Sequence, residues 1–183
     1  MITMTFPILE TERLILRQLK IEDANAMYSY ASNDDVTKFV LWDSHTSLEQ
    51  TKQFLQFMID KYKQENYAWA VTLKNSDEFI GTIDYVMLDN NEHIGEIGYA
   101  LSHLHWGKGY MSEAAQAIIQ YGFTELNLER IQARCFAGNV GSERVMQKAD
   151  MVYEGTMRKA KFSKGAYHDM KIYSIIREEA NIS

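Results

Sequence analysis

The chain has 183 residues, of which 46% are hydrophobic and 24% are charged, as is typical of a globular protein. A chain of this length buries enough apolar surface to fold without a disulfide or a metal, and we expect one domain over residues 1–183. The formal net charge of −6 argues against binding DNA or RNA through bulk electrostatics.

Localisation signals are the next feature of the chain. The first residues show no basic stretch followed by an apolar core, so no signal peptide is expected. No segment approaches the roughly 20 apolar residues of a membrane span. The single cysteine, Cys135, fits an apolar strand better than a nucleophilic site, and one cysteine allows no internal disulfide. These features predict a cytoplasmic protein that does not bind membranes.

Hydrophobic spacing predicts the elements in chain order. They are a strand over 13–19, helices from 22 and over 48–65, strands over 67–73, 78–88 and 93–102, a long helix from 110, a strand over 130–137, a short helix over 139–149, and strands over 151–162 and 166–176. This order predicts an antiparallel meander, a strand–helix–strand crossover and a closing hairpin. The second helix has two possible capping boxes, Thr46 with Glu49 or Ser47 with Gln50.

The stretch HWGKGYMSEA, residues 105–114, places two glycines around a lysine immediately before the long helix. The first amides of a helix lack partners and carry partial positive charge, so they attract phosphate. Glycine adds no Cβ and tolerates positive φ. The amides of residues 107–111 can therefore converge on a diphosphate, and Lys108 either adds charge or points to solvent.

Other readings of this loop are less suitable. A P-loop requires Ser or Thr after its lysine, where Gly109 stands, and a dinucleotide fingerprint requires a third glycine, where Ser112 stands. A tight turn that only leads into the helix remains an alternative.

The preceding strand places a carboxylate among very small residues. By alternation, one face carries Glu96, Gly98 and Ala100, and the other carries Ile97, Tyr99 and Leu101. Small side chains leave space that can admit a substrate beside the carboxylate. The alternative is an ordinary strand with a partly solvated glutamate.

The segment EIGYALSHLHWGKGYMSEAAQAIIQYGF resembles the acyl-CoA-binding core of the GNAT N-acetyltransferases, especially the branch that includes the N-terminal acetyltransferases of ribosomal proteins. The resemblance covers nearly the whole chain, through TERLILRQLKIEDA, FIGTIDY, NVGSERVMQKADMVYEG and the final hairpin. It implies an α/β (α+β) fold with a mixed, mostly antiparallel seven-stranded sheet flanked by helices. The acetyl-CoA-binding residues that it implies are Ala100, Leu101, Trp106, Gly107, Lys108, Gly109, Tyr110, Met111, Asn139 and Ser142.

The chain also departs from the pattern of the superfamily. Trp106 replaces the usual Gln or Arg but is common in this branch, whereas Met111 replaces Gly or Ala and leaves only its amide for the cofactor. Residues 149–151 are Ala-Asp-Met where Leu-Gly-Phe is common, a difference that leaves the expected chemistry intact.

The resemblance implies transfer of an acetyl group from acetyl-CoA to an amine. Glu96 is the candidate base, through a water, or it only orients the ammonium group. Asn139 would bind the pantetheine arm, unless it is only a helix cap. Ser142 would protonate the departing thiolate, unless it is an ordinary first-turn residue. Met146 stands where the superfamily often has a tyrosine, which favours Ser142 as the acid.

Three functions follow from this resemblance. The first is acetylation of a protein N-terminus, such as that of a ribosomal protein. The second is acetylation of a small amine, such as a polyamine or an aminoglycoside, and the third is a non-catalytic CoA-binding module. His103 and His105 lack companions with zinc-like spacing, so no metal site is expected. A homodimer is a reasonable expectation from the resemblance.

Overall fold

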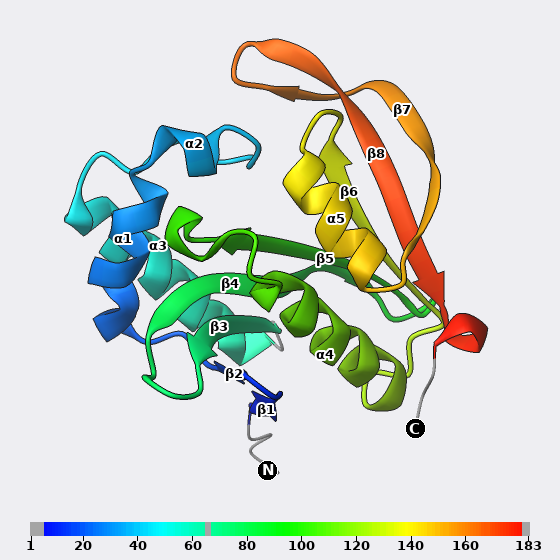
Figure 1. Ribbon diagram of the computed structural model, residues 1–183, viewed down its shortest axis with the longest axis horizontal. Coiled ribbons are helices and arrows are strands. Elements are labelled where there is room, and N and C mark those ends of the chain that lie inside the picture. Colours follow the sequence, from blue (N-terminus) through cyan, green and yellow to red (C-terminus); the bar gives the residue numbers. More distant parts are fainter. Residues whose placement is uncertain (1–5, 65–66, 181–183) are drawn as a thin grey trace.

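The computed structural model describes residues 6–64 and 67–180 as a sheet of eight strands with helices on both faces (Figure 1). The spatial order of the strands is β1-β2-β3-β4-β5-β6-β8-β7. The strands are β1 (Leu9–Glu10), β2 (Leu14–Arg17), β3 (Ala68–Leu73), β4 (Phe79–Asp89), β5 (Ile94–Leu101), β6 (Arg130–Phe136), β7 (Val152–Ser163) and β8 (Ala166–Ile176). The predicted mixed fold and element order are confirmed.

The sheet has one strand more than the seven predicted. The additional strand, β1, pairs antiparallel with β2 through Leu9 and Leu16. With only two residues, β1 is too short to show the alternation from which a strand is recognised in a sequence.

The helices lie on both faces of the sheet. They are α1 (Ala24–Ala31), α2 (Asp34–Thr37), α3 (Leu48–Asp60), α4 (Tyr110–Thr124) and α5 (Val140–Lys148), with short 3₁₀ turns η1 (Ile21–Asp23), η2 (Lys61–Gln64), η3 (His103–His105) and η4 (Arg177–Glu179). Among the described residues, the longest of these helices falls short of what a membrane crossing would need in length and apolarity.

One apolar cluster packs α1 and α3 against β3 and β4, around the fully buried Leu55 and Ala70. Ser47 caps α3 by accepting a hydrogen bond from the amide of Gln50 at 3.2 Å. The Gln50 side chain in turn accepts one from the amide of Thr46 at 2.8 Å. Of the two predicted pairs, Ser47 with Gln50 provides the cap, but the Gln50 side chain bonds the Thr46 amide and not the Ser47 amide, so the reciprocal half of the capping box does not form.

The second apolar cluster lies between the sheet and helices α4 and α5. Gly122 on α4 permits a close approach to β4, because a Cβ there would lie 2.1 Å from the hydroxyl of Tyr85. That hydroxyl donates to the carbonyl oxygen of Ile118 at 2.6 Å. The helix face through Ala115, Ile118 and Gly122 is thus the buried one, and it fixes α4 against β4.

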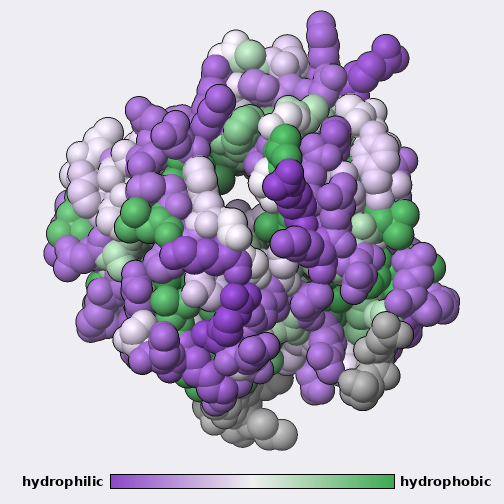
Figure 2. Space-filling view, in the orientation of Figure 1, coloured by the Kyte–Doolittle hydropathy of each residue, from purple (hydrophilic) through white to green (hydrophobic). Residues whose placement is uncertain are grey.

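Strands β5 and β6 are parallel neighbours that separate part-way along their length. Their pairing runs from Ile94 with Arg130 to Ile97 with Ala133. Beyond that point β5 continues to Leu101 and β6 to Phe136 without pairing to each other. The space-filling view shows this face of the molecule opened at its centre, between the α2 and α5 sides (Figure 2). A wedge between β5 and β6 therefore interrupts the sheet.

The long β7–β8 hairpin extends towards α2 above this opening (Figure 1). At its turn, the Lys164 ammonium donates to the carbonyl oxygen of Thr37 at the end of α2. The hairpin thereby links the two halves of the molecule across the wedge.

Candidate active site

The loop before α4 presents a bare backbone. Gly107 and Gly109 adopt left-handed conformations, with φ of +74° and +81°. A Cβ on Gly107 would meet no atom within 4 Å. Within residues 6–64 and 67–180, the amides of residues 107–111 donate to no acceptor. Residues 106–108 are exposed, so these amides are available to an anionic group.

Arg13 contacts the main chain of this loop and the first turn of α4. Its Nη1 donates to the carbonyl oxygen of Lys108 at 3.0 Å, and its Nε pairs with Glu113 on α4 at 2.7 Å. The guanidinium also lies 4.6 Å from the ring centre of Tyr110. Because C=O and the following N–H point in opposite directions in a trans peptide, the Gly109 amide is directed away from Arg13. The arginine thus turns the loop amides outward.

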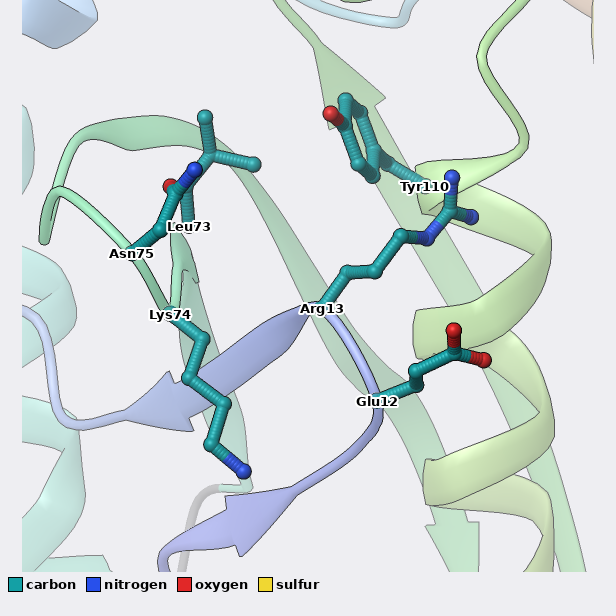
Figure 3. Close-up of a pocket in the computed structure, with 6 residues that line it drawn as sticks. All are labelled: Glu12, Arg13, Leu73, Lys74, Asn75 and Tyr110. Carbon is teal, nitrogen blue, oxygen red and sulfur yellow. The ribbon is translucent and has the colours of Figure 1, made fainter.

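A pocket of about 320 Å³ lies on the Arg13 side of the loop (Figure 3). Arg13 points across it towards Tyr110, while Lys74 points away. Its lining residues are Glu12, Arg13, Leu73, Lys74, Asn75 and Tyr110. None of these belongs to β5, β6 or α5, so the pocket is separate from the wedge.

Two more of the predicted cofactor residues, Trp106 and Met111, help to hold the loop in place. The Trp106 indole N–H donates to the carbonyl oxygen of Leu101 at 3.0 Å, which fastens the loop to the end of β5. The side chain of Met111 is buried in the core, so only its amide can reach a ligand. Ala100 and Leu101 end β5 along the unpaired edge of the wedge.

Asn139 and Ser142 approach the wedge from α5. Asn139 caps α5 by accepting a hydrogen bond from the Ser142 amide at 3.1 Å. The Ser142 hydroxyl lies 2.8 Å from the hydroxyl of Tyr99 on β5. Burial raises the pKa of Tyr99, and its hydrogen bond to Ser142 partly opposes this rise. Met146 is fully buried, so the phenol beside Ser142 comes from β5 and not from the next turn of α5.

Glu96 lies on the opposite face of β5 and is held by two neighbours on β6. Its carboxylate accepts from Gln132 Nε2 and from Arg134 Nε, each at 2.8 Å. The residue is 7% exposed. The registers place Gly98 on the same face, as alternation predicts. The site therefore offers a fixed negative charge beside the wedge.

Cys135 on β6 is buried near this site but is unsuited to nucleophilic chemistry. Burial and the charge of Glu143 raise the pKa of its thiol to about 11. A thiol in this environment remains protonated at neutral pH, whereas the thiolate is the reactive form. Its interpretation as a core residue agrees with this position.

Comparison with known proteins identifies the family of this chain. The acetyltransferase (GNAT) domain family matches residues 13–152. The chain belongs to the GNAT acetyltransferase family. It is 36% identical to the uncharacterized N-acetyltransferase YoaA of Bacillus subtilis, over 94% of this chain and 98% of that protein.

Two further relatives extend the comparison. A GNAT acetyltransferase structure from Bacillus anthracis superposes with a TM-score of 0.86 at 32% identity, covering 94% of this chain and all of that one. The ribosomal-protein-serine acetyltransferase of Escherichia coli is 28% identical, over 86% of this chain and 96% of that protein. The protein is thus a GNAT acetyltransferase and resembles members of the ribosomal branch.

Several residues of this GNAT site were missed by the sequence analysis. They are Arg13, Tyr99, Gln132 and Arg134. The alternation of Gln132 and Arg134 on β6 would have placed them on the face of Glu96 once parallel pairing was assumed. Nothing local to Arg13 indicates its contact with a loop 95 residues away.

Proposed function

We propose that this enzyme transfers the acetyl group of acetyl-CoA to a primary amine, and that its acceptor is the α-amine of a protein N-terminus. The observation that carries the proposal is the run of unpartnered amides at residues 107–111, which opens beside the wedge between β5 and β6. Acetyl-CoA supplies an acyl group activated as a thioester.

The chemistry of the residues at this site suits acetyl-CoA. The loop amides and Lys108 would hold the diphosphate, because left-handed glycines leave no Cβ in the way. The unpaired edge of β5 at Ala100 and Leu101 offers main-chain groups to the pantetheine arm. Asn139 uses its side-chain oxygen as a cap, which leaves its NH₂ group for the same arm.

The chemistry at the acceptor needs a free amine and a protonated leaving group. An α-amine has a reference pKa near 8 and a lysine side chain about 10.4, so an N-terminus loses its proton more easily at neutral pH. Glu96 either takes this proton through a water or orients the ammonium group. Ser142, bonded to Tyr99, donates a proton towards the departing thiolate.

The named function of the Escherichia coli relative supports a protein acceptor. If ribosomal proteins are the acceptors, the enzyme works in the cytoplasm, as a single domain. The two carboxylates on the acceptor side, Glu96 and Asp84, would also suit a polyamine or another small amine.

The test is acetyl-CoA turnover against a panel of peptides with free N-termini and a panel of polyamines and aminoglycosides. We expect peptides to be acetylated at the α-amine, located by fragmentation mass spectrometry. Preferential turnover of small amines would show that the acceptor is a small amine, while the proposed acetyl transfer would stand. Acetylation of no amine would contradict the proposal.

A further inference from the structure

Asp84 on β4 lies directly beside the start of the wedge. Its partner across the β4–β5 ladder is Gly98. Gly98 is the first residue of β5 beyond the last parallel pair with β6, which is Ile97 with Ala133. The point where the sheet opens for the cofactor therefore faces the Asp84 position on the neighbouring strand.

The carboxyl group of Asp84 also shares a face with Glu96. Paired residues of an antiparallel ladder point the same way, and Glu96 lies two residues before Gly98. Diagonal neighbours of this kind are about 7–8 Å apart. A Cβ on Gly98 would lie 3.6 Å from Asp84 Oδ1 and 2.8 Å from Val86 Cγ1. Gly98 adds no side chain between the two carboxyl groups, and Val86, the extra residue of a bulge in β4, borders the same space. An ammonium group beside Gly98 would therefore have a carboxyl group on each side and the Val86 methyl next to it.

The surroundings of Asp84 differ from those of Glu96. Glu96 has both oxygens engaged by Gln132 and Arg134. Asp84 has no hydrogen-bond partner within the described part of the chain, yet it keeps a partly accessible surface. Asp84 is therefore a half-buried carboxyl group whose oxygens are not committed to another side chain.

Burial raises the pKa of Asp84 to about 7, against the opposing charge of Lys61 on η2. The other titratable groups that face it are Tyr62, also on η2, and Glu96 on β5. A carboxyl that titrates near neutral pH is well matched to proton transfer at that pH. Most carboxylates are too weakly basic for this purpose.

We propose that Asp84 takes the proton from the acceptor ammonium, directly or through one water, and that Glu96 holds the ammonium in position. This inference rests on the proposed function. The ammonium gives one proton to the Asp84 carboxylate, and the free nitrogen lone pair forms the bond to the acetyl carbon as the carbon–sulfur bond breaks. The nitrogen then loses a second proton, which neutralises the departing thiolate to a thiol. Asp84 releases its proton to water.

The first experiment compares Asp84→Asn with a matched control, Glu92→Gln. Both substitutions remove one carboxylate, but Glu92 is exposed on the β4–β5 turn, away from the wedge. With a peptide that the enzyme acetylates, we expect Asp84→Asn to lower kcat by about 10²–10⁴-fold, the usual effect of losing a general base. Calorimetry should give acetyl-CoA affinities within about twofold of each other for both variants and the unmodified enzyme, since this carboxyl is not part of the cofactor loop.

The second experiment measures the pH dependence of kcat/KM with two peptides whose α-amine pKa values differ by about one unit. If Asp84 is the base, the acid limb has an apparent pKa of about 7 and stays in place for both peptides. The alkaline limb, which reports loss of the ammonium form of the peptide, moves with the peptide.

The outcomes separate this inference from the proposed function. A large loss of kcat for Asp84→Asn with a fixed acid limb supports it. An acid limb that follows the amine, or an Asp84→Asn loss no greater than that of Glu92→Gln, overturns this inference while the acetyltransferase proposal stands. Failure of the unmodified enzyme to acetylate any amine overturns both.

Discussion

The cofactor side and the acceptor side of the proposed site are built in different ways. On the cofactor side, the loop before α4 offers main-chain amides set by two left-handed glycines. On the acceptor side, the polar groups are side chains from β4, β5 and β6, among them Glu96 and Arg134. One face depends on the conformation of a few consecutive residues, and the other on strand register.

This difference determines how each face can change. The loop before α4 binds through main-chain amides, so no side chain supplies the contact. The loop therefore tolerates only residues that keep its φ values. A cluster of side chains from three strands can exchange its members without disturbing the sheet. The family can therefore retain one cofactor while its acceptors vary, and substitutions on the two faces should affect different kinetic constants.

On the cofactor face, the largest effect on acetyl-CoA affinity is expected from Gly109→Glu. The new residue must adopt φ of +81°, and its carboxylate would repel the diphosphate. We expect acetyl-CoA affinity to fall by at least about 100-fold, or about 2.7 kcal/mol, measured by calorimetry. Gly165→Glu is the matched control, because Gly165 has φ of +78° and a Cβ there would meet no atom within 4 Å, while one at Gly109 would make only an ordinary contact with Arg13 Nη2 at 3.5 Å. Equal affinities for the two variants would contradict the loop assignment.

On the acceptor face, Glu96→Gln should leave acetyl-CoA affinity unchanged. We expect kcat/KM for the amine to fall by roughly 10–100-fold, since the amide no longer attracts the ammonium group. Its loss should be smaller than that of Asp84→Asn if Glu96 positions and Asp84 takes the proton. Steady-state kinetics over about pH 6–9, where an α-amine titrates, would show this, and unaltered rates throughout would remove Glu96 from the reaction.

The hydroxyl pair of Tyr99 and Ser142, on the face of β5 opposite Glu96, should give a smaller loss. Ser142→Ala is expected to lower kcat by about tenfold, because the thiolate loses its proton donor but Tyr99 remains nearby. Tyr99→Phe should cost less on its own. Since the two hydroxyls form one unit, the double variant should lose less than the product of the single losses. Strictly multiplicative losses would show that the two groups act independently.

The same contrast explains what the sequence could reveal. The loop at 106–111 and the start of α4 follow from consecutive residues, so glycine spacing and helix-end physics indicated them directly. The position of Glu96 followed from alternation within a single strand. The order of the elements was predictable for the same reason, because each helix and strand has its own local period.

The remaining parts depend on contacts that are distant in the sequence. Arg13 reaches Lys108, and Tyr99 meets Ser142 only because α5 packs beside β5. Asp84 acquires its role from the register that places it opposite Gly98. Its identity as an aspartate in the apolar stretch FIGTIDY was visible, but the depth of its burial was not.

Asp84 should leave a thermodynamic signature that needs no substrate. Its pKa is about 7 in the folded protein against an ordinary value of 3.8, so the folded state binds the proton more tightly than the unfolded state. The stability that this provides is complete at low pH and is lost as pH rises from about 4 to about 7. An asparagine side chain at this position does not titrate, so Asp84→Asn should gain stability relative to the unmodified protein over that interval.

Because water reaches part of the carboxyl, we expect a modest gain of about 1 kcal/mol, which for this chain length is about 3 °C in Tm. The measurement is thermal unfolding of both proteins at pH 5 and pH 8, followed by circular dichroism. The exposed Glu92→Gln control should show a difference in Tm that is the same at both pH values. A pH-independent difference for Asp84→Asn would mean that this carboxyl is as well solvated when folded as when unfolded, and would remove the physical basis for its use as a base near neutral pH.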